Sequence, residues 1–280
     1  MITLETCARE WEAAGQHGLP EERIERAKQW LPYYDYLAGR QMGRPYAPDG
    51  SDDFIEALRR DGILGREISV LDIGAGMGGC ALEMAQHCRS VTALEISEAC
   101  LDVLRSRAAQ CGIGTIQPVC GAWETFQPAQ RYDFVFSAMC PAICNVEELR
   151  RMERVSRRAC CLVTVMRGST DKHRGAMMAE LGIRPKGGMV TEAIHYFNAL
   201  YLMGRQPNVR CRTIRQTYDV DAETVLTQYP IYFSIFGVEK RESRAYLEKY
   251  LAQHGDGGVL HDESTLRQAM ITWEVDGNGQ

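Results

Sequence analysis

The chain has 280 residues, and its 32 lysines and arginines against 37 aspartates and glutamates give a formal net charge of −5 at pH 7. Nucleic-acid binding depends on clustered cations, so basic residues spread along an acidic chain argue against a nucleic-acid groove. The first twenty residues lack an apolar run and no stretch approaches the length of a membrane span, so we expect a cytoplasmic protein without a membrane segment.

The first 60 residues carry helical patterns without strand alternation. The expected helices are residues 5–14, 21–37 and 52–60, separated by breaks rich in glycine and proline at residues 18–20 and 44–50. Because this section is too small for an independent core, we expect it to pack on the main domain as a helical lid over the ligand face.

Strands and helices alternate regularly from Ser69 onward. Five strands are expected, at residues 69–75, 90–96, 115–120, 131–139 and 159–167. The helices between them are expected at residues 79–88, 97–110 and 145–157. Ser97 is a suitable N-cap, with Glu98 in the first turn. Right-handed crossovers between such strands give a parallel sheet covered by helices on both faces.

The last third of the chain is less regular. A helix is expected at residues 191–203, a long strand at 210–220, helical structure at 221–253 with a break at Tyr229-Pro230, and a final strand at 266–275. The predicted fold is therefore α/β: a doubly wound, mostly parallel, seven-stranded sheet with a helical insertion before the last strand. We expect a lid at residues 1–60 and a main domain at 61–280, with the insertion at 221–260.

A glycine-rich loop follows the first expected strand: Val70-Leu71-Asp72-Ile73-Gly74-Ala75-Gly76-Met77-Gly78-Gly79. Glu95 ends the next strand, where a carboxylate can accept both hydroxyls of a ribose. Gly74, Gly76 and Gly79 also match the G-x-G-x-x-G spacing of dinucleotide sites. Asp72 weighs against a dinucleotide, because a carboxylate at the mouth of the loop repels a pyrophosphate and attracts a cationic ammonium.

The order of three motifs resembles the first, second and fourth strand motifs of the class I S-adenosylmethionine-dependent methyltransferases. They are Leu71-Asp72-Ile73-Gly74-Ala75-Gly76-Met77-Gly78, the acidic Glu95, and Tyr132-Asp133-Phe134-Val135-Phe136-Ser137. The resemblance covers residues 70–165 and implies a Rossmann-like enzyme that transfers the methyl group of S-adenosylmethionine and releases S-adenosylhomocysteine. It also implies a last strand that runs antiparallel.

The resemblance implies that the glycine loop approaches the methionine part of the cofactor, that Asp72 holds its ammonium directly or through water, and that Glu95 accepts the ribose hydroxyls. Many members carry an acidic residue for the adenine after the third strand, where this chain has Gly121 and Ala122. A backbone carbonyl, Glu124 or stacking on Trp123 then replaces that contact. The predicted cofactor-binding residues are Asp72, Gly74, Ala75, Gly76, Gly78, Glu95, Ile96, Ala122, Trp123 and Ser137.

After the fourth strand, one large subgroup of amino and base methyltransferases carries an Asn/Asp-Pro-Pro-aromatic motif. The run Ser137-Ala138-Met139-Cys140-Pro141 departs from it, which disfavours a base nitrogen or a glutamine amide and leaves O, S, C and aliphatic N acceptors open. Helical covers suggest an enclosed pocket and a small-molecule acceptor. If the acceptor needs a general base, His195 and Tyr34 are the candidates for this catalytic role.

Eleven cysteines in such a chain are expected to be reduced thiols. Cys140 and Cys144 have C-x-x-x-C spacing, but no second pair of ligands lies nearby in sequence, so we expect no metal. Two other functions stay open: an NAD(P)-dependent oxidoreductase, from the dual glycine spacing, and a non-catalytic domain that binds S-adenosylmethionine. The sequence leaves the oligomeric state open.

Overall fold

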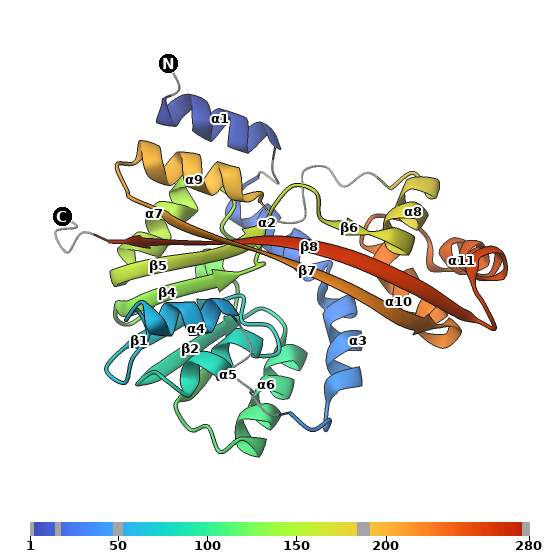
Figure 1. Ribbon diagram of the computed structural model, residues 1–280, viewed down its shortest axis with the longest axis horizontal. Coiled ribbons are helices and arrows are strands. Elements are labelled where there is room, and N and C mark those ends of the chain that lie inside the picture. The colour runs from blue at the N-terminus through green and yellow to red at the C-terminus, as the bar shows by residue number, and fades with distance from the viewer. Residues whose placement is uncertain (1–2, 15–17, 47–52, 184–190, 276–280) are drawn as a thin grey trace.

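The computed structural model describes residues 3–14, 18–46, 53–183 and 191–275, with a mixed sheet at the centre of the molecule (Figure 1). Its parallel part has the order β3-β2-β1-β4-β5, which confirms the doubly wound arrangement. These strands are β1 (Ser69–Ile73), β2 (Ser90–Glu95), β3 (Ile116–Cys120), β4 (Tyr132–Ala138) and β5 (Ser156–Val165). The strand order reverses between β1 and β4, which is where such sheets open a ligand crevice.

The last strand, β8 (Val259–Glu274), runs antiparallel to β5, as the resemblance implies. Along its other edge β8 pairs with β7 (Asn208–Asp221) over the whole length of β7. A strand of two residues, β6 (Thr170–Asp171), continues the line of β5 beside β8. The described residues thus form eight strands rather than the expected seven, because the line of β5 resumes after a short interruption.

Neighbouring residues of each inner strand point to opposite faces of the sheet and into two separate cores. Leu71 and Cys160 belong to one core, whereas Val70 and Cys161 belong to the other. The first core is covered by α1 (Leu4–Ala14), α7 (Val146–Arg154) and α9 (Ala193–Leu202). The second is covered by α4 (Asp53–Arg60), α5 (Gly79–Ala85) and α6 (Glu98–Gln110). Both faces of the sheet are buried, as expected for parallel strands.

Strands β7 and β8 continue beyond the sheet as a two-stranded ribbon that carries a second group of helices (Figure 1). With 14 residues, β7 is about 45 Å long. We call the far end of the ribbon, with α8 (Lys172–Glu180), α10 (Ala222–Ser234) and α11 (Lys240–His254), the ribbon lobe. It has its own core, which includes Val225, Phe233 and Leu247. The predicted helical insertion before the last strand corresponds to α10 and α11.

Three local expectations differ from the structure. The helix expected at residues 21–37 is divided into α2 (Pro20–Lys28) and α3 (Leu31–Gln41), because Pro32 has no N–H to continue the helix and lies in the first turn of α3. Pro230 lies inside α10 and does not break it, since burial of the flanking aromatic residues holds the helix together. Helix α8, capped by the side chain of Asp171, was not expected.

Helix α3 connects the ribbon lobe to the main sheet. On one side, the Tyr36 hydroxyl lies 2.9 Å from Thr227 Oγ1, and Gln228 Nε2 donates to the Tyr33 hydroxyl at 2.9 Å, both contacts reaching α10. On the other side, Ala38 packs against α6. None of the helices in the described residues is both long and apolar enough to cross a membrane.

Helix α1 is anchored by Trp11, which is 1% exposed, packs edge-on against Tyr196 and donates its indole N–H to Thr191 Oγ1. We expect Trp11→Ala to lower the free energy of unfolding by about 3 to 5 kcal/mol, because it leaves a cavity in the core. Urea denaturation measures this. Leu19→Ala, at a side chain 67% exposed, serves as control and should change it by less than about 0.5 kcal/mol. Equal changes in the free energy of unfolding for the two variants would contradict the packing of α1 on the core.

Candidate functional site

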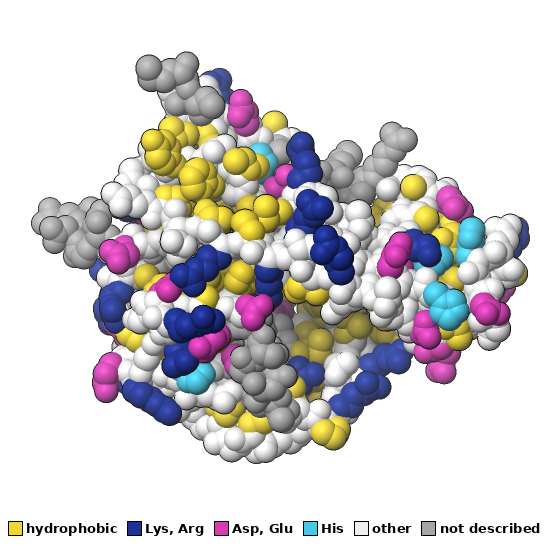
Figure 2. All heavy atoms as spheres, viewed as in Figure 1, with side chains coloured by type: hydrophobic (Ala, Val, Ile, Leu, Met, Phe, Trp, Pro, Cys, Tyr) yellow, Lys and Arg dark blue, Asp and Glu magenta, His cyan; other side chains and the backbone are white. Residues whose placement is uncertain are grey.

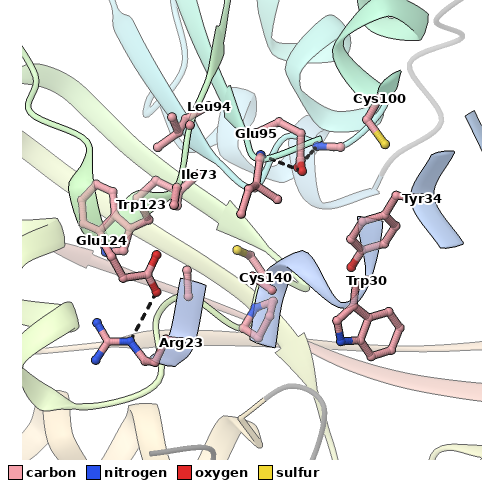
Figure 3. Close-up of a pocket in the computed structure, with 18 of the residues that line it drawn as sticks. Arg23, Trp30, Tyr34, Ile73, Leu94, Glu95, Cys100, Trp123, Glu124 and Cys140 are labelled. Atoms are coloured by element: carbon pink, nitrogen blue, oxygen red, sulfur yellow. Dashed lines mark hydrogen bonds and ion pairs between the residues drawn. The ribbon is translucent and has the colours of Figure 1, made fainter. Parts of the chain in front are cut away.

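A cavity of about 340 Å³ lies at the carboxyl ends of the parallel strands, beneath α2 and α3 (Figure 3). Its walls come from the glycine loop after β1, the end of β2, the segments after β3 and β4, and the two helices. In Figure 2 the molecular surface is hollowed between the main body and the ribbon lobe, with hydrophobic side chains inside the hollow. The crevice thus lies at the point where the strand order reverses.

The glycine loop bends tightly over the end of β1. Gly74 and Gly76 line the cavity, and both have positive φ angles of 76° and 55°. A Cβ atom on Gly74 would lie 2.5 Å from Cys140 Sγ, so the loops after β1 and β4 approach as closely as a glycine allows. Gly78 also has positive φ, but it packs on Leu104 of α6 outside the cavity lining.

Glu95 joins the glycine loop to the end of β2. Its carboxylate accepts from the backbone N–H of Gly76 at 2.9 Å, of Ile96 at 2.8 Å and of Ser97 at 3.0 Å. Glu95 is 8% exposed and lines the cavity together with Ile96. Ser97 caps α6 as expected, because its side chain accepts from Cys100 N. The carboxylate is therefore fixed by main-chain donors at the edge of the empty space.

Asp72 lies in the middle of the sheet and not at the mouth of the loop, where we expected it. It is 2% exposed and is not among the residues that line the cavity. Burial, with a smaller contribution from Glu95, raises the pKa of Asp72 to about 8. Without a cation nearby, this carboxyl is therefore mostly protonated at neutral pH.

Two more of the predicted cofactor residues do not line the cavity. Ala75 forms part of the turn, and its N–H donates to Leu94 O at 3.0 Å. Ser137 is 1% exposed and donates its hydroxyl to Ile73 O at 3.0 Å, which ties β4 to β1. Both residues stabilise the strand ends around the crevice, Ala75 through its backbone N–H and Ser137 through its hydroxyl, and neither lines the cavity.

The segment after β3 forms one wall of the cavity with Gly121, Ala122, Trp123 and Glu124. Trp123 is only 3% exposed, and its indole N–H donates to Glu148 Oε2 of α7 at 2.7 Å. The guanidinium carbon of Arg151 lies 4.1 Å from the centre of its ring. Trp123 is thus held in place in the cavity wall, and Arg151 covers one face of its ring, so that face is not open to stacking with a ligand.

The loop after β4 forms the opposite wall. Met139 has φ of 52°, which is unusual for a residue with a side chain, and it lines the cavity beside Cys140. Burial raises the pKa of the Cys140 thiol to about 12 and that of Cys144 to about 11, so neither is a thiolate at neutral pH. Among the described residues, no group of histidines, cysteines and carboxylates is arranged to hold a metal.

The two candidate bases occupy different places. Tyr34 lines the cavity, and burial, with Glu95 and Cys140 nearby, raises the pKa of its hydroxyl above the ordinary value. It can donate a hydrogen bond there, but it is not a base at neutral pH. His195 lies on α9, stacks on Trp11 with ring centres 6.2 Å apart, and does not line the cavity. Its position gives no support to a catalytic role.

Two arginines of α2 enter the cavity wall, which we did not predict from the sequence. Arg23 and Arg26 are separated by one helical turn and both line the cavity. Arg23 Nε donates to Glu124 Oε1 at 3.3 Å, and its Nη2 forms a short ion pair with Glu148 (Figure 3 shows the Glu124 contact). Only the spacing of the two arginines in an otherwise polar helix signals them in the sequence.

Comparison with known proteins agrees with this geometry. A family model described as a methyltransferase domain matches residues 70–160, whereas no curated protein matches the sequence. A putative methyltransferase from Bacillus halodurans has a similar structure, with a TM-score of 0.52, 14% identity, and coverage of 79% of this chain and 97% of the other.

Two further solved structures are similar at lower TM-scores. The CcbJ methyltransferase from Streptomyces caelestis has 25% identity and a TM-score of 0.39, covering 50% of this chain and 62% of that chain. An S-adenosylmethionine-dependent methyltransferase from Aquifex aeolicus has 13% identity and a TM-score of 0.44. The similarity covers 79% of this chain and 89% of that chain. The family model, the glycine loop and the sheet order agree. Residues 70–160 therefore match a methyltransferase domain, and the chain has a Rossmann-like fold similar to that of the putative methyltransferase.

Proposed function

We propose that the protein binds S-adenosylmethionine in the cavity beneath α2 and α3 and transfers its methyl group to a small-molecule acceptor. The position of Glu95 is the observation that carries this proposal. A carboxylate has about four lone-pair positions, and three backbone N–H groups use three of them. The remaining acceptor capacity faces the cavity, where a ribose hydroxyl is a suitable donor.

The glycine loop favours this cofactor over a dinucleotide. Gly74 N and Ala75 N both donate to Leu94 O, Gly76 N donates to Glu95, and Gly78 N donates to Ala75 O. A pyrophosphate needs such N–H groups as donors, and here they already have partners. The carboxylate of Glu95, which lines the cavity, adds repulsion toward a phosphate and attraction toward an ammonium or sulfonium group. The NAD(P) alternative is therefore disfavoured.

S-adenosylmethionine supplies an activated methyl group, whose bond to the sulfonium sulfur breaks as its bond to the acceptor lone pair forms. The chain's own residues have to orient the acceptor in line and exclude water. In this proposal the rigid wall of Trp123 and the loop at Met139 and Cys140 position the acceptor. Tyr34 supplies a hydrogen bond to it, because its hydroxyl and the Cys140 thiol both stay protonated.

We further propose that only part of the N-terminal section acts as a lid. Helices α2 and α3 and the N-cap residue between them supply Arg23, Arg26, Trp30 and Tyr34 to the cavity wall, whereas α1 packs on α9 away from it. The lid would therefore be α2 and α3, with α1 as its anchor on the main domain at residues 61–280.

The proposed cofactor site is tested by calorimetric titration with S-adenosylmethionine, S-adenosylhomocysteine and NAD in parallel. We expect micromolar binding of the two adenosyl compounds and no binding of NAD. Glu95→Gln should weaken binding of S-adenosylhomocysteine by about 1.5 to 3 kcal/mol, since it removes a charge-assisted contact. Glu98→Gln, at an exposed residue three positions away, should leave it unchanged. Binding of NAD alone would overturn the proposal.

The close approach of the loops at Gly74 leads to a second prediction. Gly74→Ala should reduce cofactor affinity at least tenfold, because the added methyl group has to displace Cys140 and the positive φ is strained. The matched control is Gly79→Ala, since a Cβ atom there meets no atom within 4 Å. The same titration compares the two variants. Equal affinities would show that the loop geometry at residue 74 is not required for binding.

Asp72 leads to a prediction about protons. Its pKa is about 8 in the folded protein against an ordinary value of 3.8, so the folded state binds more protons than the unfolded state between pH 4 and pH 8. The free energy of unfolding should therefore fall as pH rises through this window, by on the order of a few kcal/mol. Asp72→Asn should remove this part of the pH dependence in urea denaturation.

The same group should respond to the cofactor. If the methionine ammonium lies close to Asp72, the pKa of this carboxyl falls on binding, and up to one proton is released at pH 7. Calorimetry in buffers with different ionisation enthalpies counts the protons. The Asp72→Asn variant should release no proton on binding. If the unmodified protein and the variant release the same number of protons, the ammonium does not lie close to Asp72.

A further inference from the structure

The cavity has a second region that the proposed cofactor contacts do not use. The glycine loop, Glu95 and Ile96 account for one part of its lining. The rest includes residues of α2, Glu124 after β3 and the loop after β4. In Figure 3, Arg23 and Glu124 lie on one side of Cys140, whereas Trp30 and Tyr34 lie on the other. We call the part lined by Arg23, Arg26, Glu124 and Ala142 the arginine end.

The arginine end is lined in part by the loop after β4, and the methyl acceptor is expected beside this loop. Burial raises the pKa of the Cys144 thiol in this loop, and both Arg23 and Arg26 act against that increase. Arg23 and Arg26 lie one turn apart on α2, and both line the cavity, so α2 brings two cations to its wall.

The Arg23 side chain is held in place before any ligand arrives. It is 11% exposed and pairs with Glu124 and with Glu148, which are 6% and 8% exposed. Glu148 in turn accepts from the indole of Trp123 and lies 3.6 Å from Arg151. A guanidinium fixed by two carboxylates keeps its planar set of donors oriented, and little side-chain entropy remains to be lost on binding.

The chemistry of this end fits one class of ligand. Guanidinium groups bind carboxylate and phosphate oxygens with paired hydrogen bonds, and exclusion of water strengthens such contacts. Other walls of the same cavity are aromatic or apolar, with Trp30, Trp123 and Pro141. We propose that the methyl acceptor is an organic acid, whose anionic group binds at Arg23 and Arg26 while its body lies against these walls. This inference rests on the proposed function and specifies its substrate class.

The test uses three probes of similar shape and different charge: benzoate, benzamide and benzylamine. The full-length protein is first saturated with S-adenosylhomocysteine and then titrated with each probe by calorimetry. Benzoate should bind at least tenfold more tightly than benzamide, and benzylamine should bind most weakly. If S-adenosylhomocysteine itself does not bind, the proposed function fails. If it binds and benzoate has no advantage, or no probe binds at millimolar concentration, only the anion site fails.

Variants of two residues on α2 test whether Arg26 is responsible for the binding of benzoate. Arg26→Gln should weaken benzoate binding at least tenfold and leave the affinity for S-adenosylhomocysteine within twofold, and Arg26→Lys should restore part of the loss. Lys28→Gln removes a cation from the same helix at a side chain 50% exposed, and it should have no effect on either ligand. Arg26 is preferred to Arg23, because loss of Arg23 leaves two buried carboxylates without their partner.

One outcome would reverse the assignment of the arginines. If Arg26→Gln weakens binding of S-adenosylhomocysteine and leaves benzoate unaffected, the arginine end holds the carboxylate of the cofactor and the organic-acid proposal is wrong. The organic-acid proposal also fails if Lys28→Gln and Arg26→Gln reduce benzoate binding equally, since the effect then comes from the overall charge of α2.

Discussion

The site depends on one buried carboxylate that is satisfied by the main chain. Glu95 accepts from three backbone N–H groups, so it fixes the glycine loop, the end of β2 and the start of α6 relative to one another. A buried carboxylate is tolerated only when such groups donate hydrogen bonds to it. If the carboxylate is removed by substitution, these N–H groups lose their acceptor. Cavity shape and local stability therefore have the same origin. The close contact of Gly74 with Cys140 then places the loop after β4 against this fixed point.

The second level of organisation is the bridge made by α3. Its tyrosines contact α10 in the ribbon lobe, while Trp30 and Tyr34 line the cavity and Ala38 packs on α6. Rings of Trp30, Tyr33 and Tyr232 continue this contact from the cavity wall into the core of the lobe. The shape of the cavity is thus set partly by helices that are distant in sequence and that lie outside the methyltransferase domain at residues 70–160.

The features that the sequence predicted well are local ones. The alternation of strands and helices, the glycine loop and the Ser97 cap depend on residues within a few positions of each other, so their patterns are visible in the chain. Arg23 was missed because its partners, Glu124 and Glu148, lie 101 and 125 positions away. His195 was selected for its place after the fifth strand, but the packing of α1 decides where that side chain goes. Asp72 was expected at the mouth of the glycine loop, but its side chain is buried within the sheet.

The ribbon also has a consequence for how copies of this chain meet. Among the described residues, β7 pairs only with β8, so it is a long edge strand whose outer backbone groups resemble a template for another strand. Such edges promote aggregation when they are flat and uncharged. Here Arg210, Arg212 and Arg215 lie along β7, and charged side chains are one of the means by which edge strands are protected from pairing with another strand. The long reach of the ribbon therefore comes with an edge strand that depends on its charged side chains for protection against pairing with another strand.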